Sequence, residues 1–161
     1  MNDFFTKTDL SRKDAENIIS ETLNKCDDGE LYLENSKSES IVLDDDKIKS
    51  STYSSDLGYG LRAVTGEVVA YSHSNEISKD SLKQSANNLS STLKSQKGVY
   101  NHEIPKTNKK FYKDINPIEE KSLQSKLELL KEVNNYTRAK SGTVQQVTAS
   151  FSGEHKSIEI I

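Results

Sequence analysis

The sequence is poor in the residues that fill large cores and cross-link secreted domains. It contains no Trp, one Met, two Pro and one Cys, and hydrophobic residues occupy 32% of its 161 positions. The single Cys, Cys26, cannot form an internal disulfide, which favours a reducing compartment, so we expect a cytoplasmic protein. No stretch approaches the roughly 20 apolar residues of a membrane helix, and no basic region precedes an apolar run at the N-terminus. We expect one domain, or one lobe of something larger, with no membrane partner.

The charge balance also excludes some classes of partner. The net charge is −3 and the isoelectric point is near 5.7, so the chain has no global basic field to attract a phosphate backbone. We therefore expect no nucleic-acid partner. Charged residues make up 29% of the chain, which indicates a largely polar surface over a core of ordinary size.

Residues with the spacing of a metal site are missing. His102 and the Glu after it begin the zinc motif H-E-x-x-H, but Lys106 occupies the second His position. Pro105 prevents the helix that would bring two imidazoles to one metal. His73 and His155 stand far away in sequence and are more typical of exposed strand or loop positions. From the sequence we expect no catalytic residue, no metal ligand and no cofactor-binding residue in this chain.

Apolar residues at helical spacing predict three helices. The first begins at Ser11, which with Asp14 resembles a capping box, and its apolar face runs to Cys26. There Cys26 is more typical of a small core residue than of a reactive thiol. The second begins at Ser78. For the third, we expect Asn116 as N-cap, an apolar face of Leu123, Leu127, Leu130 and Val133, and Gly142 as a left-handed stop.

Alternating apolar and polar residues predict the strands. Two or three antiparallel strands are expected in residues 31–55, with a tight turn at 44–47, followed by a hairpin whose turn is Thr65-Gly66. At the end of the chain we expect a strand over 143–151, a turn at 152–155 and a returning strand over 156–161.

This order of elements predicts an α+β fold. We expect a curved antiparallel sheet with helices packed on one face, followed by a helix and a hairpin that begin a second unit. The expected domains are 1–98, a linker loop at 99–116, and a truncated unit at 117–161. The chain stops at Ile161 within an apolar strand, so we expect a fragment whose unpaired edge promotes association.

Glycines in the second hairpin superficially match a dinucleotide-binding loop. Gly58, Gly60 and Ala63 fit G-x-G-x-x-A, but such a loop must open a helix, and here a strand and a turn follow. We therefore expect these glycines to permit a bulge or a close strand contact. For Arg62 we prefer a structural pairing with a carboxylate such as Glu34 or Glu39 over anion binding.

The region from Leu31 to Ser78 resembles the N-terminal domain of the TldD/PmbA family, the so-called modulators of gyrase. The resemblance rests on a strand with a glutamate, a strand ending in an acidic turn, the motif G-x-G-x-R-A-x-x-G-E, an Ala-Tyr pair and a closing N-cap. The helices and the final strand region also fit, so it covers nearly the whole chain. The residues that carry the motif here are Gly58, Gly60, Arg62, Ala63, Gly66 and Glu67.

The resemblance implies a metalloprotease that cleaves unfolded peptides as a heterodimer with a TldE/PmbA-like paralogue. It implies a divalent metal, zinc or similar, held in the full-length protein by H-E-x-x-x-H and a late Cys. The sequence has Thr107 at the second His position of this motif, and Cys26 lies in the wrong region. We therefore expect this chain to be a non-catalytic scaffold, partner interface or wall of the substrate chamber. The alternatives are a stand-alone peptide or protein interaction module and a vestigial truncated gene product.

Overall fold

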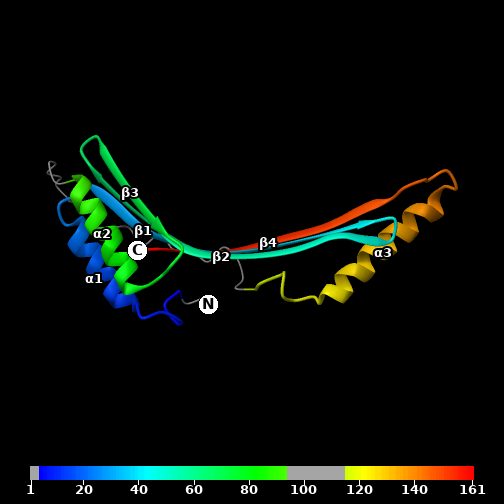
Figure 1. The fold of residues 1–161 in the computed structure, drawn as a ribbon, viewed down its shortest axis with the longest axis horizontal. Helices are drawn as coiled ribbons and strands as arrows, with labels where there is room; N and C mark the ends of the chain where they lie inside the picture. The colour runs from blue at the N-terminus through cyan, green and yellow to red at the C-terminus, as the bar shows by residue number, and fades with distance from the viewer. Residues whose placement is uncertain (1–3, 94–114) are drawn as a thin grey trace. The chain divides into compact units, whose positions relative to one another are not determined.

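The computed structural model describes residues 4–93 and 115–161 as three helices and one four-stranded sheet (Figure 1). The strands have the order β3-β2-β1-β4, so the sheet is open, with β3 and β4 at its edges. The helices are α1 (Arg12–Leu23), α2 (Lys79–Leu93) and α3 (Leu123–Lys140), and the strands are β1 (Asp28–Asp44), β2 (Lys47–Thr65), β3 (Val68–Ser74) and β4 (Thr148–Ile160). The predicted α+β class with an antiparallel sheet is confirmed.

The chain divides into two compact units whose residues interleave along the sequence. Of the described residues, unit 1 contains 4–35, 56–93 and 157–161, and unit 2 contains 36–55 and 115–156. The expected boundaries at 98 and 116 stay a prediction, and most of the expected linker, with His102, Lys106 and Thr107, lies outside the described residues.

Unit 1 is built on α1 and α2, which pack against each other, with α2 also against β3 (Figure 1). The Ser11 cap is confirmed, because its hydroxyl accepts from the Asp14 N–H at 3.1 Å. The Ser78 cap is confirmed in the same way by the Ser81 N–H at 3.2 Å. Leu31, Leu33, Leu61, Leu82 and Leu89 are almost wholly buried in this core. Burying each of these side chains contributes roughly 1.5–3 kcal/mol.

Hydroxyl groups form a small network inside unit 1. Tyr59 Oη lies 2.9 Å from both Ser81 Oγ and Ser85 Oγ, and Ser72 Oγ donates to Ser85 Oγ at 3.0 Å. Tyr59 and Ser85 are each only 4% exposed. Because a buried hydroxyl without a partner is costly, this network lets a tyrosine and a serine face the core.

Turn chemistry decides where the long strands fold back. Between β1 and β2, Asp45 and Asp46 have φ of 46° and 64°, the left-handed backbone of a two-residue hairpin turn, which Asp tolerates better than most residues. Between β2 and β3, Gly66 has φ of 59°, where glycine avoids a steric cost. The turns predicted at 44–47 and at Thr65-Gly66 are therefore confirmed.

The start of α3 differs from the prediction. Its N-cap is Ser122, whose Oγ accepts from the backbone N–H three residues on at 3.2 Å. Asn116 instead caps a turn, accepting from Ile118 N–H at 3.1 Å through its side chain and from Glu119 N–H at 3.2 Å through its carbonyl. Lys126 Nζ donates to the Ile118 carbonyl at 2.6 Å. That carbonyl therefore accepts a hydrogen bond from a side chain, and residues 115–122 form no helix.

The expected end and face of α3 also require correction. The helix ends at Ser141, which is extended with φ −156° and ψ 134°, and Gly142 is not in the left-handed region. Leu123 and Val133, expected on the buried face, are 52% and 44% exposed. The helix is turned so that Lys126 faces the sheet, where it has a charged partner.

The predicted turn at 152–155 is wrong, because β4 is one continuous strand from Thr148 to Ile160. It runs antiparallel to β1: Leu31 and Ile161 exchange backbone hydrogen bonds at 2.8 and 2.9 Å, and Asp45 N–H donates to the Val147 carbonyl at 3.0 Å. Pairing with a long neighbour keeps the intervening Ser-Gly extended despite its turn propensity.

Cys26 lies three residues beyond the end of α1 rather than on its face. It is 4% exposed and packs in the core of unit 1, and its Sγ lies 3.8 Å from the Thr22 carbonyl. The expected packing role is confirmed, although the helix ends before it.

Candidate functional site: an apolar groove between α3 and β4

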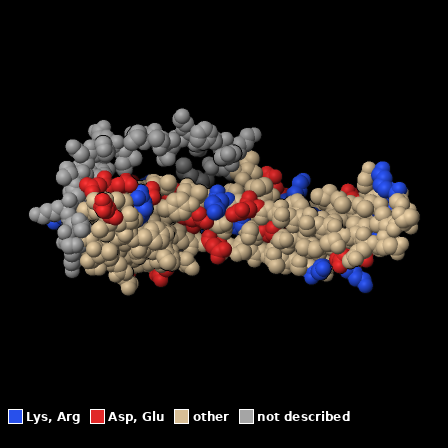
Figure 2. All heavy atoms as spheres, turned by 90° about the horizontal axis from the view of Figure 1, so that it is seen from above, with Lys and Arg blue, Asp and Glu red and all other residues tan. Residues whose placement is uncertain are grey.

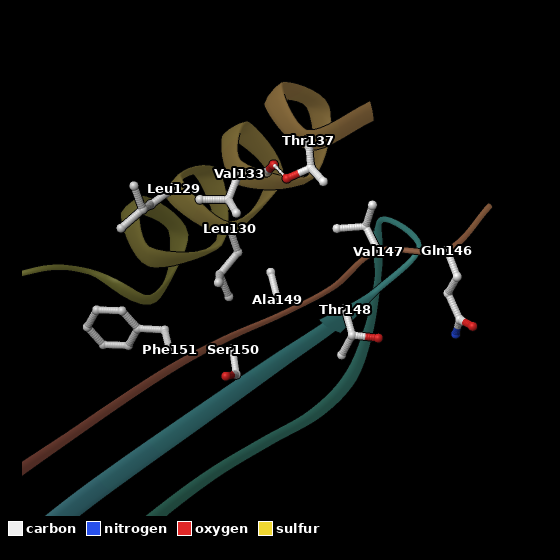
Figure 3. A pocket seen from close by; sticks show the side chains of 10 residues that line it. All are labelled: Leu129, Leu130, Val133, Thr137, Gln146, Val147, Thr148, Ala149, Ser150 and Phe151. Carbon is white, nitrogen blue, oxygen red and sulfur yellow. Dashed lines mark hydrogen bonds between the residues drawn. The ribbon is translucent and has the colours of Figure 1, made fainter. Parts of the chain in front are cut away.

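Unit 2 contains an apolar groove of about 450 Å³ between α3 and the start of β4 (Figure 3). One wall is formed by Leu129, Leu130, Val133 and Thr137 of α3, and the other by residues 146–151. We call it the α3–β4 groove. Its chemistry is that of a site for apolar side chains, because hydrophobic groups dominate its walls.

The helical wall combines one buried and two exposed side chains. Leu130 is 3% exposed and points from the helix toward Ala149 of β4 (Figure 3). Leu129 and Val133 are 48% and 44% exposed. Since positions four apart stand one above the other on a helix, these two form a continuous apolar stripe beside the groove.

The strand wall belongs to an edge of the sheet. Ala149 is 8% exposed and Phe151 is partly buried against the same small core, which also contains Ile41 and Leu43. Alternate residues of β4 face α3, as the pleat requires. The floor of the groove is therefore formed by side chains of β4.

A buried ion pair fixes the Phe151 end of the groove. Lys126 Nζ lies 2.5 Å from Glu39 Oε1, and the two side chains are only 5% and 11% exposed. The same ammonium binds the Ile118 carbonyl at 2.6 Å and lies 5.8 Å from the centre of the Phe151 ring. Three favourable contacts offset the cost of removing this charge from water.

Acidic side chains of the β1–β2 turn fix the opposite end. Asp44 Oδ1 accepts from Gln146 Nε2 at 2.9 Å and from Thr148 Oγ1 at 2.8 Å. These hydrogen bonds, with Lys49 at 3.8 Å, hold the pKa of Asp44 below its ordinary value of 3.8. Asp45 accepts from the Val147 N–H at 2.9 Å and pairs with Arg138 of α3.

No metal-binding constellation accompanies the groove. Within residues 4–93 and 115–161, no three His, Cys, Asp or Glu side chains lie together as metal ligands. His73 stacks on Tyr71 with ring centres 5.9 Å apart, and His155 lies on β4. The groove can hold apolar groups, and the polar side chains among its lining residues are those of Thr137, Gln146, Thr148 and Ser150.

The sequence-predicted motif residues lie in unit 1, on β2 and in the β2–β3 turn. A side chain at Gly58 would come within 2.7 Å of the Ser74 carbonyl oxygen, and one at Gly60 would collide with Tyr71 Oη. The predicted close strand contact is therefore confirmed for both. Ala63 is fully buried opposite Ala70.

The remaining motif residues hold the hairpin to β1 and its preceding turn. Gly66 N–H donates to Asp27 Oδ2 at 2.6 Å, and Glu67 completes the β2–β3 turn. Arg62 donates to Asp28 at 2.7 Å and to Glu30 at 3.1 Å. The hydrogen bonds that the guanidinium donates, first to Asp28 and then to Glu30, raise its pKa above its already high value.

The pairing of Arg62 with a carboxylate is confirmed, but the expected partners Glu34 and Glu39 are wrong. Arg62 follows the second turn residue, Asp46, by 16 positions, so the β1 residue beside it lies about 16 positions before the turn, near Gly29. Glu34 and Glu39 lie too close to the turn to reach Arg62, and Glu39 binds Lys126 instead.

The described residues on the face seen in Figure 2 carry charges of both signs. Figure 2 shows acidic and basic side chains interspersed on the face in view, with much uncharged surface between them. In the part of the chain that the structure describes, no helix combines the length and apolar character needed to cross a membrane.

Comparison with known proteins identifies the family of this chain. Residues 29–92 match the family domain described as PmbA/TldA metallopeptidase domain 1. The chain is 35% identical over 133 residues to the "Metalloprotease TldD homolog" of Buchnera aphidicola from Acyrthosiphon pisum, covering 82% of this chain and 28% of that protein. The chain belongs to the TldD/PmbA family. The "Metalloprotease TldD homolog" of Haemophilus influenzae is 30% identical, over 99% of this chain and 34% of that protein.

Solved structures share the fold of this TldD/PmbA-family chain. A protein named as a modulator of DNA gyrase from Thermotoga maritima superposes with a TM-score of 0.67 at 12% identity, over 93% of this chain and 35% of that one. TldE from Thermococcus kodakarensis superposes with a TM-score of 0.57 at 14% identity, over 91% and 34%. The chain thus spans about a third of the length of the relatives it matches.

Sequence reasoning missed the buried Lys126–Glu39 pair and the exposed stripe of α3. A signal for the pair was present, because Lys126 falls between Leu123 and Leu130 at the spacing of the apolar face. A charged residue on such a face indicates either that the buried face was predicted wrongly or that the charge has a buried partner. In this structure Leu123 of the predicted face is exposed, and Lys126 is buried beside Glu39.

Proposed function

We propose that this chain is a non-catalytic part of a TldD-like metallopeptidase that cleaves unfolded peptides, and that it supplies a scaffold and a surface for the partner subunit. One observation carries the proposal: the chain matches metalloproteases named TldD homologues while spanning about a third of their length. The residues of its family motif are engaged in strand contacts and ion pairs in unit 1, which is a structural use.

The names of these relatives imply a divalent metal in a full-length protein. The residues present here do not fit such an ion, because H-E-x-x-x-H is absent from the sequence and the described residues gather no ligand set. We therefore derive no catalytic step from this chain.

The α3–β4 groove supports the partner-surface role. Its exposed stripe of Leu129 and Val133 stands beside a pocket of about 450 Å³, and exposed apolar surface next to a pocket is typical of an interface. The expected partner is a TldE/PmbA-like paralogue, since TldE has the same fold over this region. A cytoplasmic location stays a prediction.

Binding to a TldE-type protein tests this role. We expect the chain to bind it in calorimetric titration, and Leu129→Glu to weaken binding by at least about tenfold, because a charge would enter an apolar contact. Leu123→Glu is the matched control: it lies on the same helix, is 52% exposed against 48% for Leu129, and does not line the groove. Equal effects of the two substitutions, or no binding by the unaltered chain, contradict the assignment of this surface.

A peptidase assay tests the non-catalytic part. The purified chain, incubated with zinc and unfolded casein, is expected to leave the casein intact. Zinc-dependent cleavage that follows the chain through purification would show that it carries a catalytic site of its own.

A stand-alone interaction module is the second candidate, and the same groove is the observation in its favour. In that case the chain would bind short apolar peptides without any TldE-type protein. Fluorescence titration with such peptides, again comparing Leu129→Glu with Leu123→Glu, separates the two functions.

A further inference from the structure

The apolar stripe beside the α3–β4 groove continues along the exposed side of α3. Leu129 and Val133 are followed by Tyr136, which is 65% exposed. The spacing of four and then three residues is that of the seam between two packed helices, where each helix repeats apolar residues at these intervals. The stripe therefore suits packing against another helix, and the groove next to it offers room for side chains of that helix.

Two carboxylates lie along this stripe. Glu132 lies three positions after Leu129 and four before Tyr136, so it borders both on the helix surface. Glu128 lies one turn earlier, four positions before Glu132. Both glutamates are exposed. Glu128 accepts from Gln124 at 2.9 Å, and neither glutamate forms an ion pair with another described residue. The stripe therefore has an acidic border, formed by Glu128 and Glu132.

The basic residues of α3 do not neutralise the acidic border. Lys126 is buried with its own partner. Lys131 and Arg138 have no residue of the stripe three or four positions away, so they lie on another side of the helix. Lys140 lies at the far end, 4.4 Å from the centre of the last ring of the stripe. The strand wall, residues 146–151, contains no charged residue. The charge next to the stripe is therefore negative over most of its length.

A second copy of α3 does not match this border. If two stripes packed antiparallel about a two-fold axis near Val133, each Glu132 would approach the Glu132 of the other copy, and like charges brought together are costly. Basic side chains at the same places would instead form pairs with the glutamates. Charge therefore favours a different helix over a second copy of this one.

We propose that the α3–β4 groove and its stripe bind an amphipathic helix whose apolar face is bordered by lysine or arginine. The inference rests on the proposed partner surface and adds the chemistry that a partner presents there. Apolar residues of the bound helix pack on Leu129 and Val133, and its basic residues lie against Glu128 and Glu132. Complementary charges at such a border select among partners and speed association more than they add affinity.

Two model peptides test the charge of the bound helix. Both are amphipathic helices with the same leucine face and a tryptophan, and they differ only in carrying lysine or glutamate beside that face. The chain has no Trp, so tryptophan fluorescence of the peptide reports its binding. We expect the lysine peptide to bind roughly tenfold more tightly at about 0.01 M salt. The preference should disappear at about 1 M salt, where charges are screened beyond about 3 Å.

Matched variants locate the contact. Glu132→Lys should remove most of the advantage of the lysine peptide. Glu120→Lys makes the same change of net charge at an exposed residue outside α3, so it should leave the advantage in place. Leu129→Ser should weaken both peptides. Equal effects of the two lysine substitutions, or equal binding of the two peptides at low salt, overturn the proposal. A chain that binds neither peptide but self-associates through Leu129 overturns it in favour of a second copy.

These outcomes are distinct from those that test the proposed function. Titration with a TldE-type protein shows whether this surface meets that partner. If that protein binds through Leu129 while the two peptides bind equally, the partner surface stands and its preference for basic residues falls. If the lysine peptide binds as expected and the TldE-type protein does not, the site for a basic helix stands and the partner assigned to it is wrong.

Discussion

Replacing Lys126 with Met should destabilise unit 2 strongly while keeping the volume of the side chain. The Lys126 side chain is 5% exposed, and its ammonium binds Glu39 at 2.5 Å and the Ile118 carbonyl at 2.6 Å and lies over Phe151. Without it, a carboxylate that is only 11% exposed loses its cationic partner. The substitution therefore removes more than one attractive contact.

The magnitude follows from the cost of leaving a buried charge unpaired. Removing one partner of a buried ion pair costs roughly 3–5 kcal/mol. Since Glu39 keeps some exposure, we take the lower limit, about 3 kcal/mol. The double variant Lys126→Met/Glu39→Met removes both charges, and we expect it to regain most of the loss, because an apolar pair of similar volume is often neutral in a core.

Hydrogen exchange of α3 amides, read by mass spectrometry, measures this effect within unit 2. A loss of 3 kcal/mol accelerates exchange through local opening by on the order of a hundredfold. Urea unfolding followed by far-UV circular dichroism gives the matching change for the whole chain. A loss below about 1 kcal/mol for Lys126→Met, or a double variant less stable than the single one, would refute the reasoning.

Three further predictions concern the hairpins and the turn. Gly58→Ala should cost about 1–3 kcal/mol in urea unfolding, because its methyl would meet a backbone oxygen, whereas Gly60→Ala should cost less, because it would meet the end of an exposed tyrosine. Similar losses for both would contradict the contacts. Tyr59→Phe should cost about 1 kcal/mol through loss of its two hydroxyl contacts, and a neutral result would mean that water replaces them. Because the pKa of Asp44 is lowered on folding, the contribution of its carboxylate to the free energy of unfolding is present above about pH 4 and is lost as the pH falls further. Asp44→Asn should therefore make the free energy of unfolding depend less on pH in this acidic range. An unchanged dependence would count against a stabilising role of the Asp44 carboxylate.

The α3–β4 groove shows why part of the site escaped sequence reasoning. The helix itself was predictable, since Leu123, Leu127 and Leu130 recur at its period. Its rotation was not, because the partner that lets Lys126 face inward is Glu39, 87 positions earlier. Which of two apolar faces of a helix becomes buried depends on the side chains of the strand against which the helix packs.

Local chemistry in the sequence determined the elements whose signals do not depend on distant residues. The caps at Ser11 and Ser78, the acidic turn at 44–47 and the Gly66 turn follow from side chains that bond to, or relieve strain in, their own backbone. Tertiary structure alone decided that residues 152–155 extend as part of β4, that α3 begins only after Ser122, and that Arg62 pairs with Asp28 and Glu30. The physical reason is the same in each case: strand pairing and charge pairing between distant residues outweigh local preferences of about 1 kcal/mol or less.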